Sequence, residues 1–132
     1  MVDASVALSW VLPGEDTSVA LKLREKASGK PQMLLLVPPI FWYEVANVLW
    51  VANRRNRLSR DKAIEALSVL FDFGFTSWNA SPATCLQLSF AHNLAVYDSA
   101  YLTIALEEKA VLWTMDQALR GAAEKLEIDL DP

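Results

Sequence analysis

The sequence predicts an α/β fold in which helices cover a central, mainly parallel sheet. Short apolar runs, such as residues 33–37 and 110–115, alternate with helical stretches of about ten residues or more, an alternation typical of parallel-sheet proteins. The runs are continuously apolar, as expected for strands buried on both faces. Asp3 and Asp116 follow directly where two apolar runs end, and open α/β sheets bind their ligands at such positions.

Start and stop signals place the remaining elements. A first helix over residues 6–12 stops at Pro13-Gly14, and the second takes its N-cap from Asp16, Thr17 or Ser18. We expect further helices over residues 40–55, 59–73, 81–92, 99–109 and 117–126. Additional strands are expected at residues 75–78 and 128–130.

Length and composition indicate one domain, residues 1–132, without a membrane span. No apolar run reaches the ~18 residues that a spanning helix needs. No basic segment leads into an apolar core near the start, so we expect no signal peptide. Cys85 is the single cysteine, which excludes an internal disulfide and predicts a reducing, cytoplasmic setting.

The positive charge is unevenly distributed. The net charge of −4 argues against tight, non-specific binding of nucleic acid. Five of the 12 Lys and Arg residues nevertheless gather in one segment: Arg54, Arg55, Arg57, Arg60 and Lys62. This segment is either a solvated helix end with its loop or a patch that steers phosphate groups.

Three aspartates precede expected helices. Asp is a favoured N-cap worth about 1 kcal/mol, so capping alone could explain Asp3, Asp98 and Asp116. The two roles, cap and ligand, do not exclude each other.

Glu44 is harder to explain as a structural residue. It lies at the centre of an apolar stripe on the helix expected over residues 40–55, where an unpaired carboxylate is costly. Asn47 or Arg55 could pair with it on that face. The other possible partner is a metal ion shared with the aspartates.

Gathering these carboxylates would require a cation. Two unit charges ~4 Å apart repel by about 4 kcal/mol at an effective dielectric of 20. Mg²⁺ or Mn²⁺ would remove that repulsion, because both prefer oxygen ligands. Zinc is not expected, since Cys85 and His92 stand alone. An all-carboxylate site suits phosphoryl chemistry, in which a metal activates water and neutralises phosphate charge.

Four stretches of the sequence resemble PIN-domain proteins, and most of all the VapC-type toxins of toxin–antitoxin pairs. They are Val2–Leu8, Pro38–Leu49, Val96–Leu102 and Trp113–Leu119. Each motif is short, but the four occur in order over nearly the whole chain.

The resemblance implies a three-layer α/β/α sandwich and a Mg²⁺- or Mn²⁺-dependent endoribonuclease, the toxin of a type II toxin–antitoxin pair. It implies that the catalytic and metal-binding residues are Asp3, Glu44, Asp98 and Asp116. Thr114 matches a position that supports the last aspartate, and we add Ser5 and Asn47 as supporting residues. An RNA substrate, an antitoxin partner and a homodimer are implied as well.

Only Met1 and Val2 precede Asp3, fewer apolar residues than the family usually has. We therefore expect Asp3 to be the least firmly held of the four carboxylates.

Two further features leave alternatives open. Trp42, Ala46, Leu49 and Trp50 lie on the helix face opposite Glu44, so that face is either buried within the domain or packed on a second copy or an antitoxin. Tyr97 and Tyr101 flank Asp98 and are either core residues or a base-stacking platform.

An alternative function is a non-catalytic PIN-like binding module. In that case the acidic pocket would bind an arginine of a partner protein, since a carboxylate pair matches the guanidinium fork.

Overall fold

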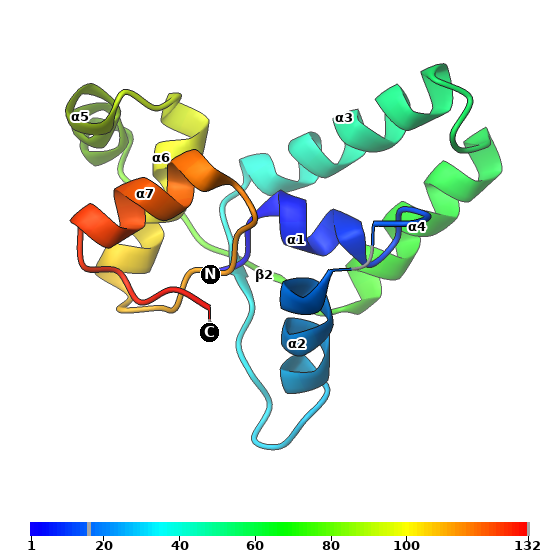
Figure 1. Cartoon of the computed structure of the whole chain (residues 1–132), viewed down its shortest axis with the longest axis horizontal. Coiled ribbons are helices and arrows are strands. Elements are labelled where there is room, and N and C mark those ends of the chain that lie inside the picture. Colours follow the sequence, from blue (N-terminus) through cyan, green and yellow to red (C-terminus); the bar gives the residue numbers. More distant parts are fainter. Residues whose placement is uncertain (16, 132) are drawn as a thin grey trace.

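A computed structural model describes residues 1–15 and 17–131. Seven helices and two short strands are assigned within those residues (Figure 1). In chain order they are α1 (Ala4–Ser9), α2 (Ser18–Ala27), β1 (Leu36–Val37), α3 (Ile40–Arg54), α4 (Arg60–Asp72), β2 (Thr76–Ser77), α5 (Pro82–His92), α6 (Val96–Glu107) and α7 (Gln117–Lys125).

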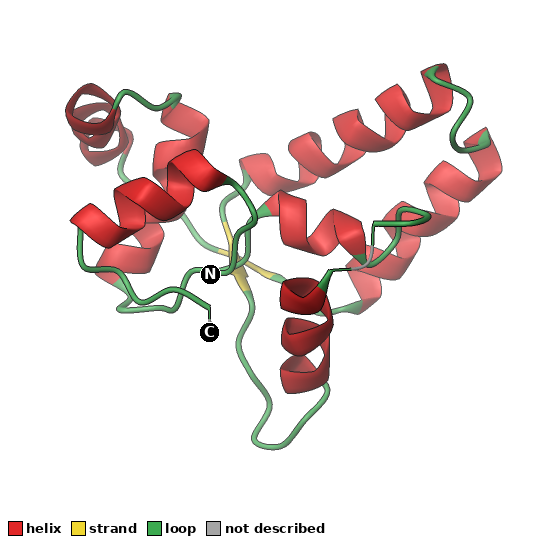
Figure 2. Ribbon diagram, in the orientation of Figure 1, coloured by secondary structure: helices red, strands yellow, loops and turns green. Residues whose placement is uncertain are grey.

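The centre of the molecule is a narrow parallel ladder. Strands β1 and β2 pair in parallel, and isolated parallel bridges join Val2 to Trp113 and Leu112 to Leu130. The Val2 amide donates to the Leu36 carbonyl at 3.0 Å, which links the N-terminal segment to β1. The extended segments therefore lie side by side between the helices, as Figure 2 shows for β1 and β2.

Apolar side chains pack on both faces of this ladder. Val37 belongs to a core formed mainly with α1, α2, α3 and α4, whereas its neighbour Leu36 belongs to a core formed with α6 and α7. Successive strand residues point to opposite faces, so one ladder serves two cores. The predicted α/β fold with helices on both sides of a parallel sheet is confirmed.

The extended segments are shorter than the sequence predicted. The runs expected as strands over residues 33–37 and 75–78 form β structure only at β1 and β2, and residues 110–115 and 128–130 contribute single bridges. Their apolar runs reflect burial rather than strand length, because a fully buried segment is apolar whether or not its ladder is regular.

Most helix boundaries agree with the predictions to within one or two residues, with two exceptions. Helix α1 spans Ala4–Ser9 rather than residues 6–12. Helix α6 begins at Val96 rather than Ser99, so Asp98 lies in its first turn and is not an N-cap. Thr17 caps α2 by accepting from the Ala20 amide, and Asp16 lies outside the described residues.

Helices α3 and α4 form an antiparallel pair that extends away from α5, α6 and α7 (Figure 1). Leu49 is buried at 3% exposure, and the Trp42 ring stacks on Phe71 with centroids 4.3 Å apart. For Leu49 the burial agrees with the alternative that this face packs within the domain, because Leu49 belongs to the chain's own core. Ala46 and Trp50 remain exposed.

Among the described residues, no helix has the length and apolar character that crossing a membrane requires.

Two leucines of α2 provide a direct test of the packing. Leu23 is fully buried, whereas Leu21 on the same helix is 50% exposed. We expect Leu23→Ala to lower the free energy of unfolding by about 2–5 kcal/mol, because it leaves a cavity. Leu21→Ala should change it by about 0.5 kcal/mol or less. Urea unfolding measures both, and equal losses would contradict the arrangement of α2.

Candidate active site

Asp3 is held at the end of the N-terminal extended segment by three contacts. Its amide donates to the Trp113 carbonyl at 2.9 Å, and its Oδ2 accepts from the hydroxyls of Ser5 and Thr114, both at 2.7 Å. The residue is only 7% exposed. The expectation that Asp3 is the least firmly held carboxylate was wrong, because neighbouring chain segments anchor it more than the residues before it do.

Thr114 connects Asp3 to Asp116. The Thr114 hydroxyl donates to Asp3 and accepts from the Asp116 amide at 3.0 Å. Asp116 in turn caps α7, its Oδ1 accepting from the Leu119 amide at 2.9 Å. The Ser5 hydroxyl also accepts from the Met115 amide at 3.2 Å. Ser5 and Thr114 thus hold the Asp3 carboxylate against the backbone of Met115 and Asp116.

Glu44 reaches the same region from α3. Its Oε2 accepts from the Tyr101 hydroxyl at 2.9 Å, and Tyr101 is itself fully buried. Neither of the partners considered from sequence fulfils this role: within residues 1–15 and 17–131, no hydrogen bond joins Glu44 to Asn47 or Arg55. Both of those side chains lie exposed.

Sequence reasoning considered Tyr101 but missed its role as the partner of Glu44. Tyr101 follows Asp98 by three residues, which places the two side chains on one face of α6. The buried position of Tyr101 agrees with the core role, one of the two roles considered from sequence. Its hydroxyl also orients Glu44. The i, i+3 spacing was the available signal.

Three of the four carboxylates, Asp3, Glu44 and Asp98, have raised pKa values. Burial raises the pKa of Glu44 to about 7, with further contributions from the charges of Asp3 and Asp98, against the lowering effect of the Tyr101 hydrogen bond. Burial also raises the pKa of Asp3, and the Asp116 charge adds to it. For Asp98, burial again comes first, followed by the charges of Asp116 and Asp3. Burial and neighbouring negative charge therefore both disfavour the ionisation of these three groups.

A family model of the PIN domain matches residues 1–125. The chain belongs to the PIN-domain family. It is 34% identical over 123 residues to "Ribonuclease VapC3" of Pyrobaculum aerophilum, a match that covers 90% of both chains. The structure also resembles the crystal structure of PAE2754 from Pyrobaculum aerophilum, with a TM-score of 0.71 at 20% identity, over 92% of this chain and 82% of that one. The resemblance seen in the sequence motifs is confirmed.

The acidic residues of this PIN domain fit a hard divalent cation. All the candidate ligands are carboxylate oxygens, and burial, followed by neighbouring negative charge, raises the pKa values of Asp3, Glu44 and Asp98. In the part of the chain that the structure describes, no three His, Cys, Asp or Glu side chains are grouped closely enough to hold a metal ion by themselves. Mg²⁺ commonly binds through one or two carboxylates and retains several waters, so it does not require three direct protein ligands.

Two residues outside the group of carboxylates, Arg120 and Asp131, support the Thr114 backbone. Arg120 on α7 donates to the Thr114 carbonyl at 3.0 Å and to Asp131 Oδ1 at 2.6 Å. Asp131 is 5% exposed, so this ion pair is largely shielded from water. Sequence reasoning missed both residues, because neither lies in a motif.

A groove contains both a residue that contacts Asp3 and part of the basic segment. It has a volume of about 230 Å³, and its lining includes Ser5, which donates to Asp3, together with Glu15, Arg55 and Arg57. Arg57 pairs with Glu15 at 3.1 Å, which compensates part of its charge.

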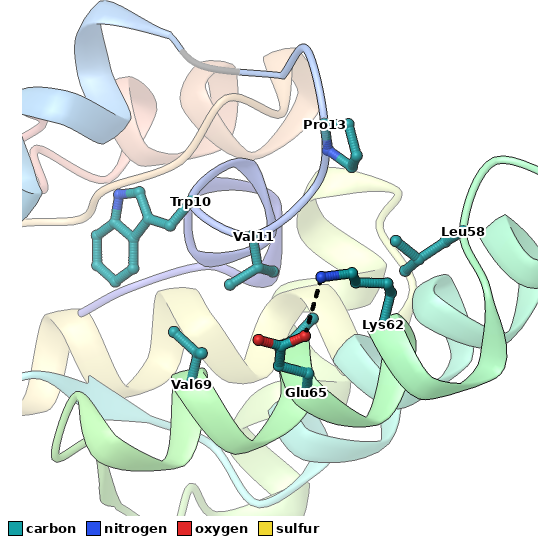
Figure 3. A pocket seen from close by; sticks show the side chains of 8 residues that line it. Trp10, Val11, Pro13, Leu58, Lys62, Glu65 and Val69 are labelled. Atoms are coloured by element: carbon teal, nitrogen blue, oxygen red, sulfur yellow. Dashed lines mark hydrogen bonds and ion pairs between the residues drawn. The ribbon is translucent and has the colours of Figure 1, made fainter.

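The rest of the basic segment faces elsewhere. The Arg54 guanidinium lies 5.0 Å from the centre of the Trp50 ring, and Arg60 is exposed at the start of α4. Lys62 pairs with Glu65 at 3.3 Å in a different pocket, between α1 and α4 (Figure 3). Of the predicted RNA-steering residues, Arg55 and Arg57 are thus the two that reach the groove.

The raised pKa of Glu44 predicts a pH-dependent stability in metal-free protein. A carboxyl group whose folded pKa is raised stabilises the fold at low pH, and that contribution is lost as pH rises through the folded pKa. Relative to Glu44→Gln, the wild type should therefore lose stability between pH 4.5 and about 7. Urea unfolding with a chelator present measures this difference.

Glu124→Gln is the control, because Glu124 is exposed on α7. It should track the wild type across the same pH range. A wild-type to Glu44→Gln difference that does not change with pH would contradict the account of Glu44.

Proposed function

We propose that this PIN domain is a Mg²⁺- or Mn²⁺-dependent endoribonuclease and the toxin of a type II toxin–antitoxin pair. The observation that carries the proposal is that Asp3, Glu44, Asp98 and Asp116 lie in one region: neighbouring carboxylate charges contribute to the raised pKa values of Asp3, Glu44 and Asp98, and Thr114 links Asp3 to the Asp116 amide. The similarity to a VapC ribonuclease supports RNA as the substrate.

The four carboxylates would hold the cation directly or through water. When bound, the ion supplies an activated water and neutralises charge on the scissile phosphate. The chain itself sets the positions of the oxygens. Thr114 and Ser5 fix Oδ2 of Asp3, and Tyr101 holds Oε2 of Glu44, so that Oε1 is the Glu44 oxygen left to face an ion or a water.

The groove from Ser5 to Arg55 and Arg57 would guide the RNA backbone. Its two guanidinium groups are the positive charges that line the cavity beside the acidic site. Because the net charge of the chain is −4, this local patch would orient the RNA rather than provide strong non-specific affinity.

Two surfaces of the α3–α4 pair would serve the protein partners. A cavity of about 420 Å³ between α1 and α4, lined by Trp10, Val11, Leu58 and Val69, has the size and apolar character to receive an antitoxin segment (Figure 3). Trp50 and Ala46 line a separate cavity on the outer side of the pair, which we assign to a homodimer contact. The buried free thiol of Cys85 and an RNA substrate are in keeping with a cytoplasmic setting.

Cleavage assays on RNA test the acidic site. We expect Asp98→Asn and Asp3→Asn each to lower the Mg²⁺- or Mn²⁺-dependent cleavage rate on the order of 100-fold or more, because each removes one charged ligand from the shared site. Asp72→Asn, which changes an exposed acid at the end of α4, should cleave like the wild type. Undiminished cleavage by Asp98→Asn would sink the assignment.

Metal binding separates the enzyme from a binding module. Calorimetry of the wild type with Mn²⁺ should give a binding isotherm that Asp98→Asn weakens. A protein that binds no divalent metal at millimolar concentration would instead fit the alternative function, in which the acidic pocket takes a partner's arginine.

Light scattering coupled to size exclusion tests the homodimer. Trp50 is 55% exposed, and large exposed aromatic residues are frequent anchors of interfaces. We expect a dimer at micromolar concentration that Trp50→Ala shifts toward monomer. Leu86→Ala, which removes a 46% exposed leucine on α5, should leave the dimer intact. A wild-type monomer would exclude this contact.

A further inference from the structure

A second cavity is lined in part by the helices that carry Glu44 and Asp98. It has a volume of about 260 Å³ and lies among the N-terminal ends of α3, α5 and α6. Its lining includes Pro38, Ile40, Asn79, Val96 and Tyr97. Nothing in the acidic site described above uses this cavity.

The helices that carry two of the carboxylates also form its walls. Ile40 precedes Glu44 by one turn of α3, a rise of about 5–6 Å along the axis. Tyr97 directly precedes Asp98 in the first turn of α6. A nucleotide whose phosphate lies at the carboxylates would therefore have this cavity within reach of its base.

The lining has the chemistry of a base-binding site rather than a phosphate-binding site. The described residues that line it carry no charge, so a phosphate inside would be without a counter-charge. The Tyr97 side chain is 62% exposed, which leaves its ring open for stacking. Asn79 offers an amide that can both donate and accept, as the edge of a nucleobase requires.

The size of the cavity favours one flat group over a protein segment. Pockets that bury a drug-sized ligand have volumes of about 300–1,000 Å³, and this cavity is somewhat smaller. Unpaired RNA bases are recognised by stacking on aromatic side chains together with hydrogen bonds to the base edges.

We propose that this cavity binds an unpaired nucleobase beside the scissile phosphate, with Tyr97 as the stacking surface and Asn79 contacting the base edge. The inference rests on the proposed ribonuclease function and adds to it a subsite for one base that flanks the scissile phosphate. Two roles were considered for these tyrosines from sequence. The inference assigns base stacking to Tyr97 and the core role to Tyr101.

The test combines protein variants with an altered substrate. A short single-stranded RNA that the wild type cleaves is compared with versions that carry an abasic residue at each nucleotide flanking the cleaved bond. We expect Tyr97→Ala to raise KM roughly 5- to 150-fold on the intact RNA, as the loss of one stacked base predicts. On the RNA that is abasic at the critical position, Tyr97→Ala and the wild type should have equal KM values.

Two variants serve as controls for this comparison of the wild type and Tyr97→Ala on intact and abasic RNA. Tyr97→Phe keeps the ring and should restore most of the affinity that Tyr97→Ala loses on the intact RNA. Phe90→Ala removes an 80% exposed aromatic side chain of α5 outside the cavity, and should leave the KM for both RNAs unchanged. Thermal unfolding of each variant verifies that the fold is intact.

The outcomes separate the inference from the function on which it rests. Cleavage by the wild type with an unchanged KM for Tyr97→Ala would overturn the base site and leave the ribonuclease standing. No cleavage of any RNA by the wild type with Mg²⁺ or Mn²⁺ would overturn both. A Tyr97→Ala protein that loses its dimer but keeps the wild-type KM would show that a second copy covers the cavity, and would also overturn the base site.

Discussion

The acidic site depends on one hydroxyl group. Thr114 donates to the carboxylate of Asp3 and accepts from the amide of Asp116, so a single side chain links two acidic residues from opposite ends of the chain. The contact exists because the N-terminal segment and the segment that carries Trp113 form a parallel bridge just before these residues. Arg120, which is paired with Asp131, donates to the Thr114 carbonyl. The sheet is short, but it is long enough to hold Asp3 beside Thr114.

Bringing the carboxylates together in a partly buried site has an electrostatic cost. Burial, to which the charges of Asp3 and Asp98 add, raises the pKa of Glu44 to about 7. A cation can relieve the unfavourable charge in such an arrangement. Two cavities complement the site: the lining of one includes arginines, and that of the other is mainly apolar and includes an aromatic side chain. Together they could hold the backbone and a base of one strand.

Much of the fold and of the candidate site could be predicted from the sequence, for identifiable reasons. Local signals determine helix ends well. Thr17, one of the N-cap choices, caps α2, and the helices expected from residues 59 and 81 are capped by Ser59 and Ser81. Strand length was overestimated, because an apolar run reports burial and not the extent of a ladder. The partner of Glu44 was not predictable from its own helix, since Tyr101 approaches from a different element far along the chain.

The central claim is that the Thr114 hydroxyl positions the carboxylates for a divalent cation, and Mn²⁺ affinity measured by calorimetry tests it most directly. Thr114→Val keeps the shape of the side chain and removes the hydroxyl, whereas Thr114→Ser keeps the hydroxyl. The account predicts that Thr114→Val weakens Mn²⁺ binding by about 10- to 100-fold, the usual effect of losing a residue that orients a ligand. It predicts that Thr114→Ser stays close to the wild type. Equal Mn²⁺ affinity for the wild type and Thr114→Val would contradict the account.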